Sequence, residues 1–134
     1  MNQPGSLPRR LGEYINSELH DAQLYTILSR SAPSDRDKEI LEEYSDDCRD
    51  NAGIFMKLYQ RMTGYKFTPK PVPMKENGSY RAVLKGRIRE EIRLSKKYRR
   101  EYLSISDDMQ LKRAFFNAYH NSLEHAVGII DLLS

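Results

Sequence analysis

Apolar residues recur every three or four positions along four long stretches of this 134-residue chain. In the first stretch the repeat passes through Leu11, Ile15, Ala22 and Tyr25. This spacing places the apolar side chains on one face of an α-helix. The pattern predicts four helices, at about 7–31, 35–63, 80–104 and 108–133. Because no strand-like alternation competes with this repeat, the predicted fold class is all-α.

The boundaries of the predicted helices carry residues suited to capping. N-cap residues accept hydrogen bonds from the first free backbone N–H groups, and serine and aspartate are preferred there. The predicted caps are Ser6, Ser34, Ser79 and either Asp107 or Asp108. Gly64 provides a stop for the second helix, because glycine readily adopts the left-handed backbone that ends helices.

The lengths of the links predict how the helices are connected. Short links join the first helix to the second and the third to the fourth, so each pair is expected to form an antiparallel hairpin. Residues 65–78 include Pro69, Pro71 and Pro73 and are expected to be extended. The expected architecture is a four-helix bundle forming one domain over residues 1–134, with two antiparallel helical hairpins joined by a long crossover.

Composition restricts the class of protein further. Charged residues make up 31% of the chain and hydrophobic residues 39%. No apolar run is long enough to span a membrane, and the N-terminus has no signal-peptide core. The single cysteine, Cys48, excludes an intramolecular disulfide and favours a reducing compartment. We therefore expect a soluble cytoplasmic protein without membrane contact.

Two glutamates interrupt the apolar repeat at equivalent places. Glu18 precedes Tyr25 by seven residues, and Glu91 precedes Tyr98 by the same interval. Seven residues are about two helical turns, so each pair shares the apolar face of its helix. A carboxylate buried in such a face is costly unless it is compensated. The repetition therefore indicates two halves of one polar site.

The other two helices offer polar residues at the same height. Cys48 and Asn51 lie three residues apart on the second helix, and Ser122 and His125 lie three apart on the fourth. Carboxylate bundles that bind two iron or manganese ions take one Glu from each of two helices and a Glu-x-x-His pair from each of the others.

The chain here resembles the ferritin-like superfamily, and within it the short rubrerythrin-like bacterial proteins. The resemblance covers nearly the whole chain, and its motifs are Glu18–Tyr25, Asn51–Gly64, Glu91–Tyr98 and His125–Ala126. It implies a ferritin-like four-helix bundle. It also implies that Glu18, Glu91 and His125 are the remaining metal ligands.

Three positions depart from the pattern of that family. Cys48 and Ser122 stand where the family has bridging glutamates, and Asn51 stands where it has a histidine. Two carboxylates do not balance the charge of two divalent ions, so the di-metal site is expected to be degenerate. We expect no cofactor and a non-enzymatic binding or scaffold protein, with Glu18 and Glu91 in a buried polar cluster flanked by Tyr25 and Tyr98.

Two alternatives remain open from the sequence. The first is a protein that keeps a single iron, manganese or zinc ion on Glu18, Glu91 and His125, with possible redox activity as a ferritin-like oxidoreductase. The second concerns a basic run, in which nine basic and three acidic residues lie between Arg81 and Tyr102. This run suits nucleic acid or another polyanion.

The basic run has a simpler interpretation, which the sequence favours. It is then a solvated face complemented by the acidic stretch from Asp35 to Asp50, within one molecule or across a dimer. The expected partner is therefore a second copy of the chain, in a homodimer.

Overall fold

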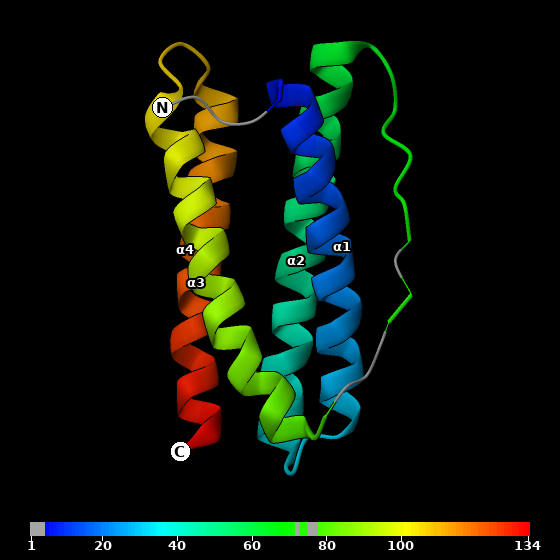
Figure 1. Ribbon diagram of the computed structural model, residues 1–134, viewed down its shortest axis with the longest axis vertical. Coiled ribbons are helices and arrows are strands. Elements are labelled where there is room, and N and C mark those ends of the chain that lie inside the picture. Colours follow the sequence, from blue (N-terminus) through cyan, green and yellow to red (C-terminus); the bar gives the residue numbers. More distant parts are fainter. Residues whose placement is uncertain (1–4, 72, 75–77) are drawn as a thin grey trace. The chain divides into compact units, whose positions relative to one another are not determined.

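Four α-helices make up the regular structure of the protein. The computed structural model describes residues 5–71, 73–74 and 78–134. The helices are α1 (Leu7–Arg30), α2 (Asp35–Thr63), α3 (Tyr80–Ser104) and α4 (Met109–Leu133). Figure 1 shows them coloured along the sequence, from blue in α1 to red in α4. The predicted all-α class is confirmed, and the predicted boundaries agree with these helices to within one residue at each end.

The predicted N-caps form hydrogen bonds in the structure. The hydroxyl oxygens of Ser6, Ser34 and Ser79 each accept a bond from the backbone N–H three residues later, at 3.3, 3.1 and 3.2 Å. Asp108, rather than Asp107, caps α4 by accepting from the N–H of Leu111 at 3.1 Å. The three serine caps were therefore identifiable from local sequence, because their partners lie within one turn, whereas the choice between Asp107 and Asp108 came from the structure.

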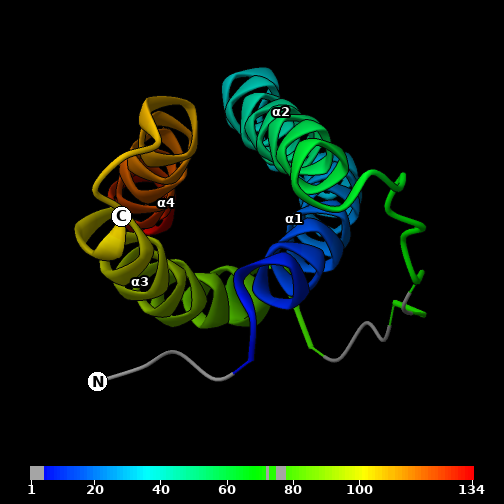
Figure 2. The same cartoon turned by 90° about the horizontal axis from the view of Figure 1, so that it is seen from above.

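Helices α1 and α2 form the first hairpin and run antiparallel (Figures 1 and 2). Tyr14 packs on Phe55 and Tyr25 on Tyr44, with ring centroids 6.1 and 5.6 Å apart. Residue numbers therefore increase along α1 in the direction in which they decrease along α2, as in an antiparallel pair. The buried hydroxyl of Ser45 donates to the carbonyl of Ala22 at 2.7 Å.

Helices α3 and α4 form the second hairpin, and their contact is extensive. Tyr98 packs on Phe115 with ring centroids 6.1 Å apart, and Tyr102 packs on Phe116 at 5.6 Å. The ammonium of Lys112 lies 4.3 Å from the centroid of the Tyr102 ring, and it also donates to two carbonyls at the α3–α4 link. These contacts hold the link end of the hairpin in place.

The connection after α2 packs against α1. Gly64, with φ of +78°, ends α2 in the left-handed conformation expected of glycine. The Phe67 ring then lies edge-on to Tyr59, with centroids 5.1 Å apart, and over Gly12. The side-chain oxygen of Asn16 accepts a hydrogen bond from the backbone N–H of Lys70 at 2.9 Å. The long predicted connection is thus tied to the first hairpin.

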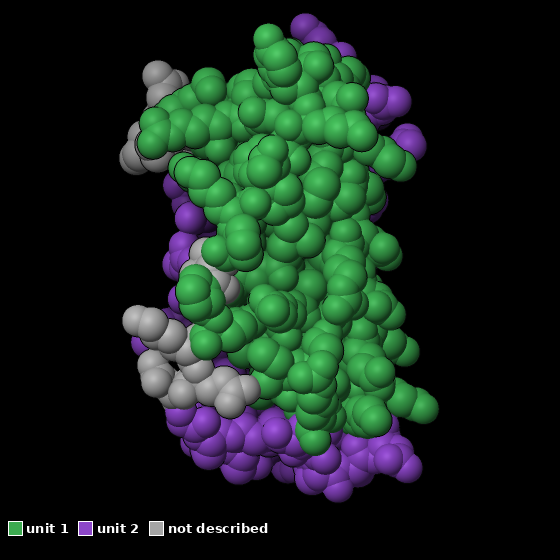
Figure 3. Space-filling view, turned by 90° about the vertical axis from the view of Figure 1, so that its right-hand side faces the viewer, with its two compact units in different colours: residues 1–30, 38–74 green, residues 31–37, 75–134 purple. Residues whose placement is uncertain are grey.

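The chain divides into two compact units, coloured in Figure 3. One contains residues 1–30 and 38–74, and the other contains residues 31–37 and 75–134. Each contains most or all of one hairpin. The single domain predicted over the whole chain stays a prediction. None of the helices in the described ranges is long and apolar enough to cross a membrane.

Candidate functional site

The six positions of the predicted site are all buried. Their exposed fractions are 5% or less: Glu18, Cys48 and Asn51 in the first hairpin, and Glu91, Ser122 and His125 in the second. The apolar repeat therefore assigned their burial correctly, although all six are polar or small. Glu18 and Glu91 are 3% and 2% exposed, so each carboxyl group is removed from water at a substantial cost.

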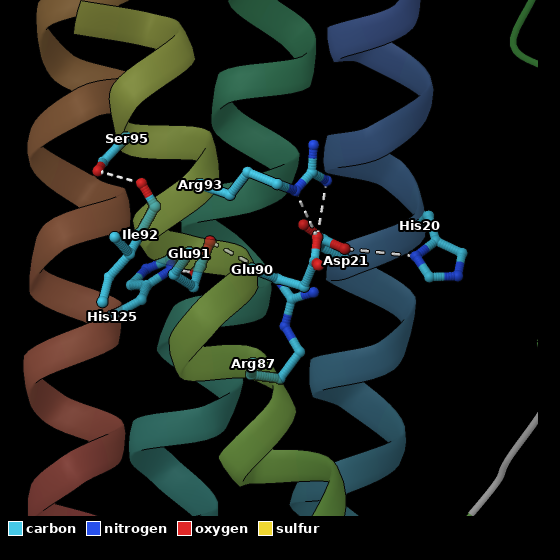
Figure 4. A network of polar contacts seen from close by, with 9 residues as sticks. All are labelled: His20, Asp21, Arg87, Glu90, Glu91, Ile92, Arg93, Ser95 and His125. Atoms are coloured by element: carbon cyan, nitrogen blue, oxygen red, sulfur yellow. Dashed lines mark hydrogen bonds and ion pairs between the residues drawn. The ribbon is translucent and has the colours of Figure 1, made fainter.

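Glu91 and His125 meet within the second hairpin. The imidazole Nδ1 of His125 lies 2.7 Å from Oε2 of Glu91, and both side chains are almost fully buried (Figure 4). With Nδ1 protonated, the imidazole donates this hydrogen bond, which fixes its ring orientation. The structure thus brings together two of the three residues that the family resemblance implied as ligands.

Arg87 is the third member of this cluster, and the sequence interpretation missed it. It lies one turn before Glu91 on α3, and its Nη2 is 3.5 Å from Oε1 of Glu91. Only 6% of the residue is exposed. The sequence counted it among the cations of the basic run, which is wrong for this residue. The available signal was its spacing, since Arg87 is four residues from Glu91 and shares its face.

The cluster has its own charge compensation. One oxygen of Glu91 faces the guanidinium of Arg87, and the other faces the imidazole of His125. An arginine is always charged, so the buried carboxylate has a permanent cation beside it. Such a cluster offsets the cost of burying each ion, provided that every member keeps its partner. We refer to Arg87, Glu91 and His125 as the ion cluster.

Ser122, Tyr25 and Tyr98 contribute less to the ion cluster than Glu91 and His125 do. Ser122 is one turn before His125 on α4 and brings a hydroxyl where the family pattern has a carboxylate. Tyr25 and Tyr98, the predicted flanking residues, are completely buried and pack on Tyr44 and Phe115. Their rings are therefore part of the hydrophobic core of each hairpin.

Among the described residues, no group of three or more His, Cys, Asp and Glu is placed to hold a metal ion. In the second hairpin a fixed guanidinium already lies beside Glu91, and an added cation there meets like-charge repulsion.

A second carboxylate–imidazole pair lies on α1 and was not predicted. Asp21 is buried at 4% exposure, and its Oδ1 is 3.3 Å from Nδ1 of the neighbouring His20. Figure 4 shows this pair as well. His20 keeps about a third of its side chain in solvent. Two adjacent residues on a helix point to different sides, so an apolar repeat of three or four residues does not reveal this pair.

Comparison with known proteins does not place this chain in a family. No protein-family model, curated protein or solved structure matches it.

Proposed function

We propose that this chain is a ferritin-like protein in which a protein cation has replaced the metal, and that it acts as a non-enzymatic binding or scaffold protein. The observation that carries the proposal is the position of Arg87. Its guanidinium lies 3.5 Å from the carboxylate that the family resemblance implies as a ligand. The positive charge that a metal ion would bring to Glu91 is therefore part of the polypeptide.

Three features of the second hairpin support this proposal. Arg87 compensates Glu91 without a bound ion, and the imidazole of His125 is already used by the same carboxylate. Ser122 provides no charge for a bridging role. A metal-dependent oxidoreductase needs open coordination positions and several anionic ligands, whereas the ion cluster offers one carboxylate, with a partner on each oxygen.

The proposed replacement of a metal ion by Arg87 can be reversed experimentally within the second hairpin. The double variant Arg87→Gln with Ser122→Glu removes the competing cation and restores a Glu-x-x-His pair on α4, facing Glu91. We expect wild-type protein to bind no Co²⁺ or Fe²⁺ above background. We expect the double variant to bind about one ion per chain by titration calorimetry, because three ligands are then available.

The control is Ser122→Glu alone, which adds the same carboxylate but keeps Arg87. If Arg87 replaces the metal, this single variant binds the ion much more weakly than the double variant. Equal binding by both variants contradicts the proposal. Tight binding of about one metal ion per wild-type chain also contradicts it, and favours the alternative of a single retained iron, manganese or zinc ion.

A further inference from the structure

The solvent-facing side of α3 carries a row of cations. Five of them form what we call the basic face: Lys85, Arg89, Lys96, Arg99 and Arg100, all exposed. At 100° per residue they fall within an arc of about 100° on the helix. From the first to the last, the row spans about 23 Å at 1.5 Å per residue. These side chains therefore place five positive charges along one side of α3.

The acidic residues of α3 do not neutralise this surface. Glu91 and Glu101 are 2% and 1% exposed, so two of the three carboxylates lie in the interior. The third, Glu90, is bound by the guanidinium of Arg93 at 2.7 Å. In the sequence, these three carboxylates are counted against the basic residues. In the structure, burial and pairing remove them from the net charge that α3 exposes to solvent.

The five cations also lack carboxylate partners. Among the residues that the structure describes, no ion pair within 4.0 Å involves any member of the basic face. Carboxylates of the acidic stretch pair instead with arginines close by on α2, as in Asp37 with Arg36 and Asp46 with Arg49, at 3.6 and 3.3 Å. The complementation of the basic run by the acidic stretch, expected within one molecule or across a dimer, stays a prediction.

We propose that the basic face of α3 binds the phosphate backbone of double-stranded nucleic acid, without base specificity. A row of cations on a rigid helix matches a regular array of phosphates, and each contact releases condensed counterions. Single strands are a poorer fit, because they are usually bound through exposed aromatic rings, and the basic face has none. This inference goes beyond the proposed function, since it concerns exposed residues outside the ion cluster.

An anionic membrane is also a poorer partner. An interfacial helix needs a broad apolar face to insert among the lipids. The apolar face of α3 is occupied, since Leu84, Leu94 and Tyr98 are buried. Of the large apolar residues of α3, all of which are described, only Ile92 and Leu103 are exposed. The surface of α3 therefore offers charge with little apolar area.

The test is fluorescence anisotropy of a labelled random-sequence DNA duplex, titrated with the full chain at several salt concentrations. Five phosphate contacts predict a slope of log K against log salt of about −4.5, at about −0.9 for each contact. The variant Lys85→Gln/Arg89→Gln/Lys96→Gln is expected to reduce the magnitude of this slope by about three and to lower affinity at low salt. The substituted residues are exposed, and circular dichroism checks that the variant is folded.

The matched control is Lys38→Gln/Lys57→Gln/Lys66→Gln, which removes the same charge from exposed residues outside α3. It is expected to retain most of the wild-type affinity and slope. An equal loss in both triple variants shows that net charge alone is responsible, which overturns the proposal. So does failure of the wild type to bind the duplex at low salt, or tighter binding to phosphatidylserine vesicles than to the duplex.

Discussion

Arg87 and Glu91 lie one helical turn apart on α3, with 3.5 Å between Nη2 and Oε1, and their side chains are 8% and 3% exposed. Salt bridges between exposed groups contribute little to stability, but a buried pair behaves differently. Each ion of a buried pair depends on its partner, because loss of one leaves an uncompensated charge in the interior. This dependence makes the energetic role of the pair measurable.

The first prediction concerns this coupling. Arg87→Leu and Glu91→Leu are each expected to lower the free energy of unfolding by about 3–5 kcal/mol, because each leaves a buried charge without the opposite charge beside it. The double variant is expected to lose less than the sum of the two, since leucines pack against each other. Urea denaturation of the four proteins gives the coupling energy. Additive losses would show that the two groups do not stabilise one another.

The second prediction compares two glycines in helices. A Cβ atom at Gly12 would lie 2.7 Å from Cε1 of Phe67, whereas a Cβ atom at Gly53 meets nothing within 4 Å. Gly53→Ala is expected to raise stability by about 0.5–1 kcal/mol, the usual gain from replacing glycine inside a helix. Gly12→Ala is expected to lower stability by about 1–3 kcal/mol through overcrowding. Both variants carry the same Gly→Ala change. Thermal unfolding of the two therefore compares their stabilities directly.

If Gly12→Ala instead gains stability like Gly53→Ala, the Phe67 ring does not rest on α1. Chymotrypsin cleavage after Phe67 provides an independent readout. It is expected to be faster in Gly12→Ala than in wild type, because the displaced connection exposes its backbone.

The third prediction concerns Tyr80 at the start of α3. Its hydroxyl is buried and has no hydrogen-bond partner within the described part of the chain. Burial, and to a lesser degree the nearby Asp37 carboxylate, raise the pKa of Tyr80 above its ordinary value of 10.0. Tyr80→Phe is expected to be neutral or to stabilise the protein by up to about 1 kcal/mol, because an unpaired buried hydroxyl is removed.

The same residue predicts a difference at alkaline pH. Since the pKa of Tyr80 is higher in the folded state, the unfolded chain releases the phenolic proton first. Stability from the protonated group is therefore complete below pH 10.0 and is lost as pH rises through the folded pKa. The stability of wild type should fall more steeply above this pH than that of Tyr80→Phe. Parallel pH profiles from urea denaturation would contradict this assignment.

The sequence by itself determined the helices and their ends. The apolar repeat defines which face of each helix is buried, and Ser6, Ser34, Ser79 and Asp108 cap helices through bonds within one turn. Both depend on neighbours along the chain, so local rules suffice for them. The repeat also identified Glu18, Glu91 and His125 as buried, because burial follows from position on the face rather than from residue type.

Only the tertiary structure decided what the buried polar residues contact. The distance between Glu91 and His125 depends on how α4 lies beside α3, and helical periodicity does not contain that register. Burial likewise separates Arg87, which is 6% exposed, from Lys85 and Arg89, which face solvent, although all three belong to one basic run. Side chains a few residues apart on a helix point in different directions, so the packing of the neighbouring helix decides which charges are compensated and which face water.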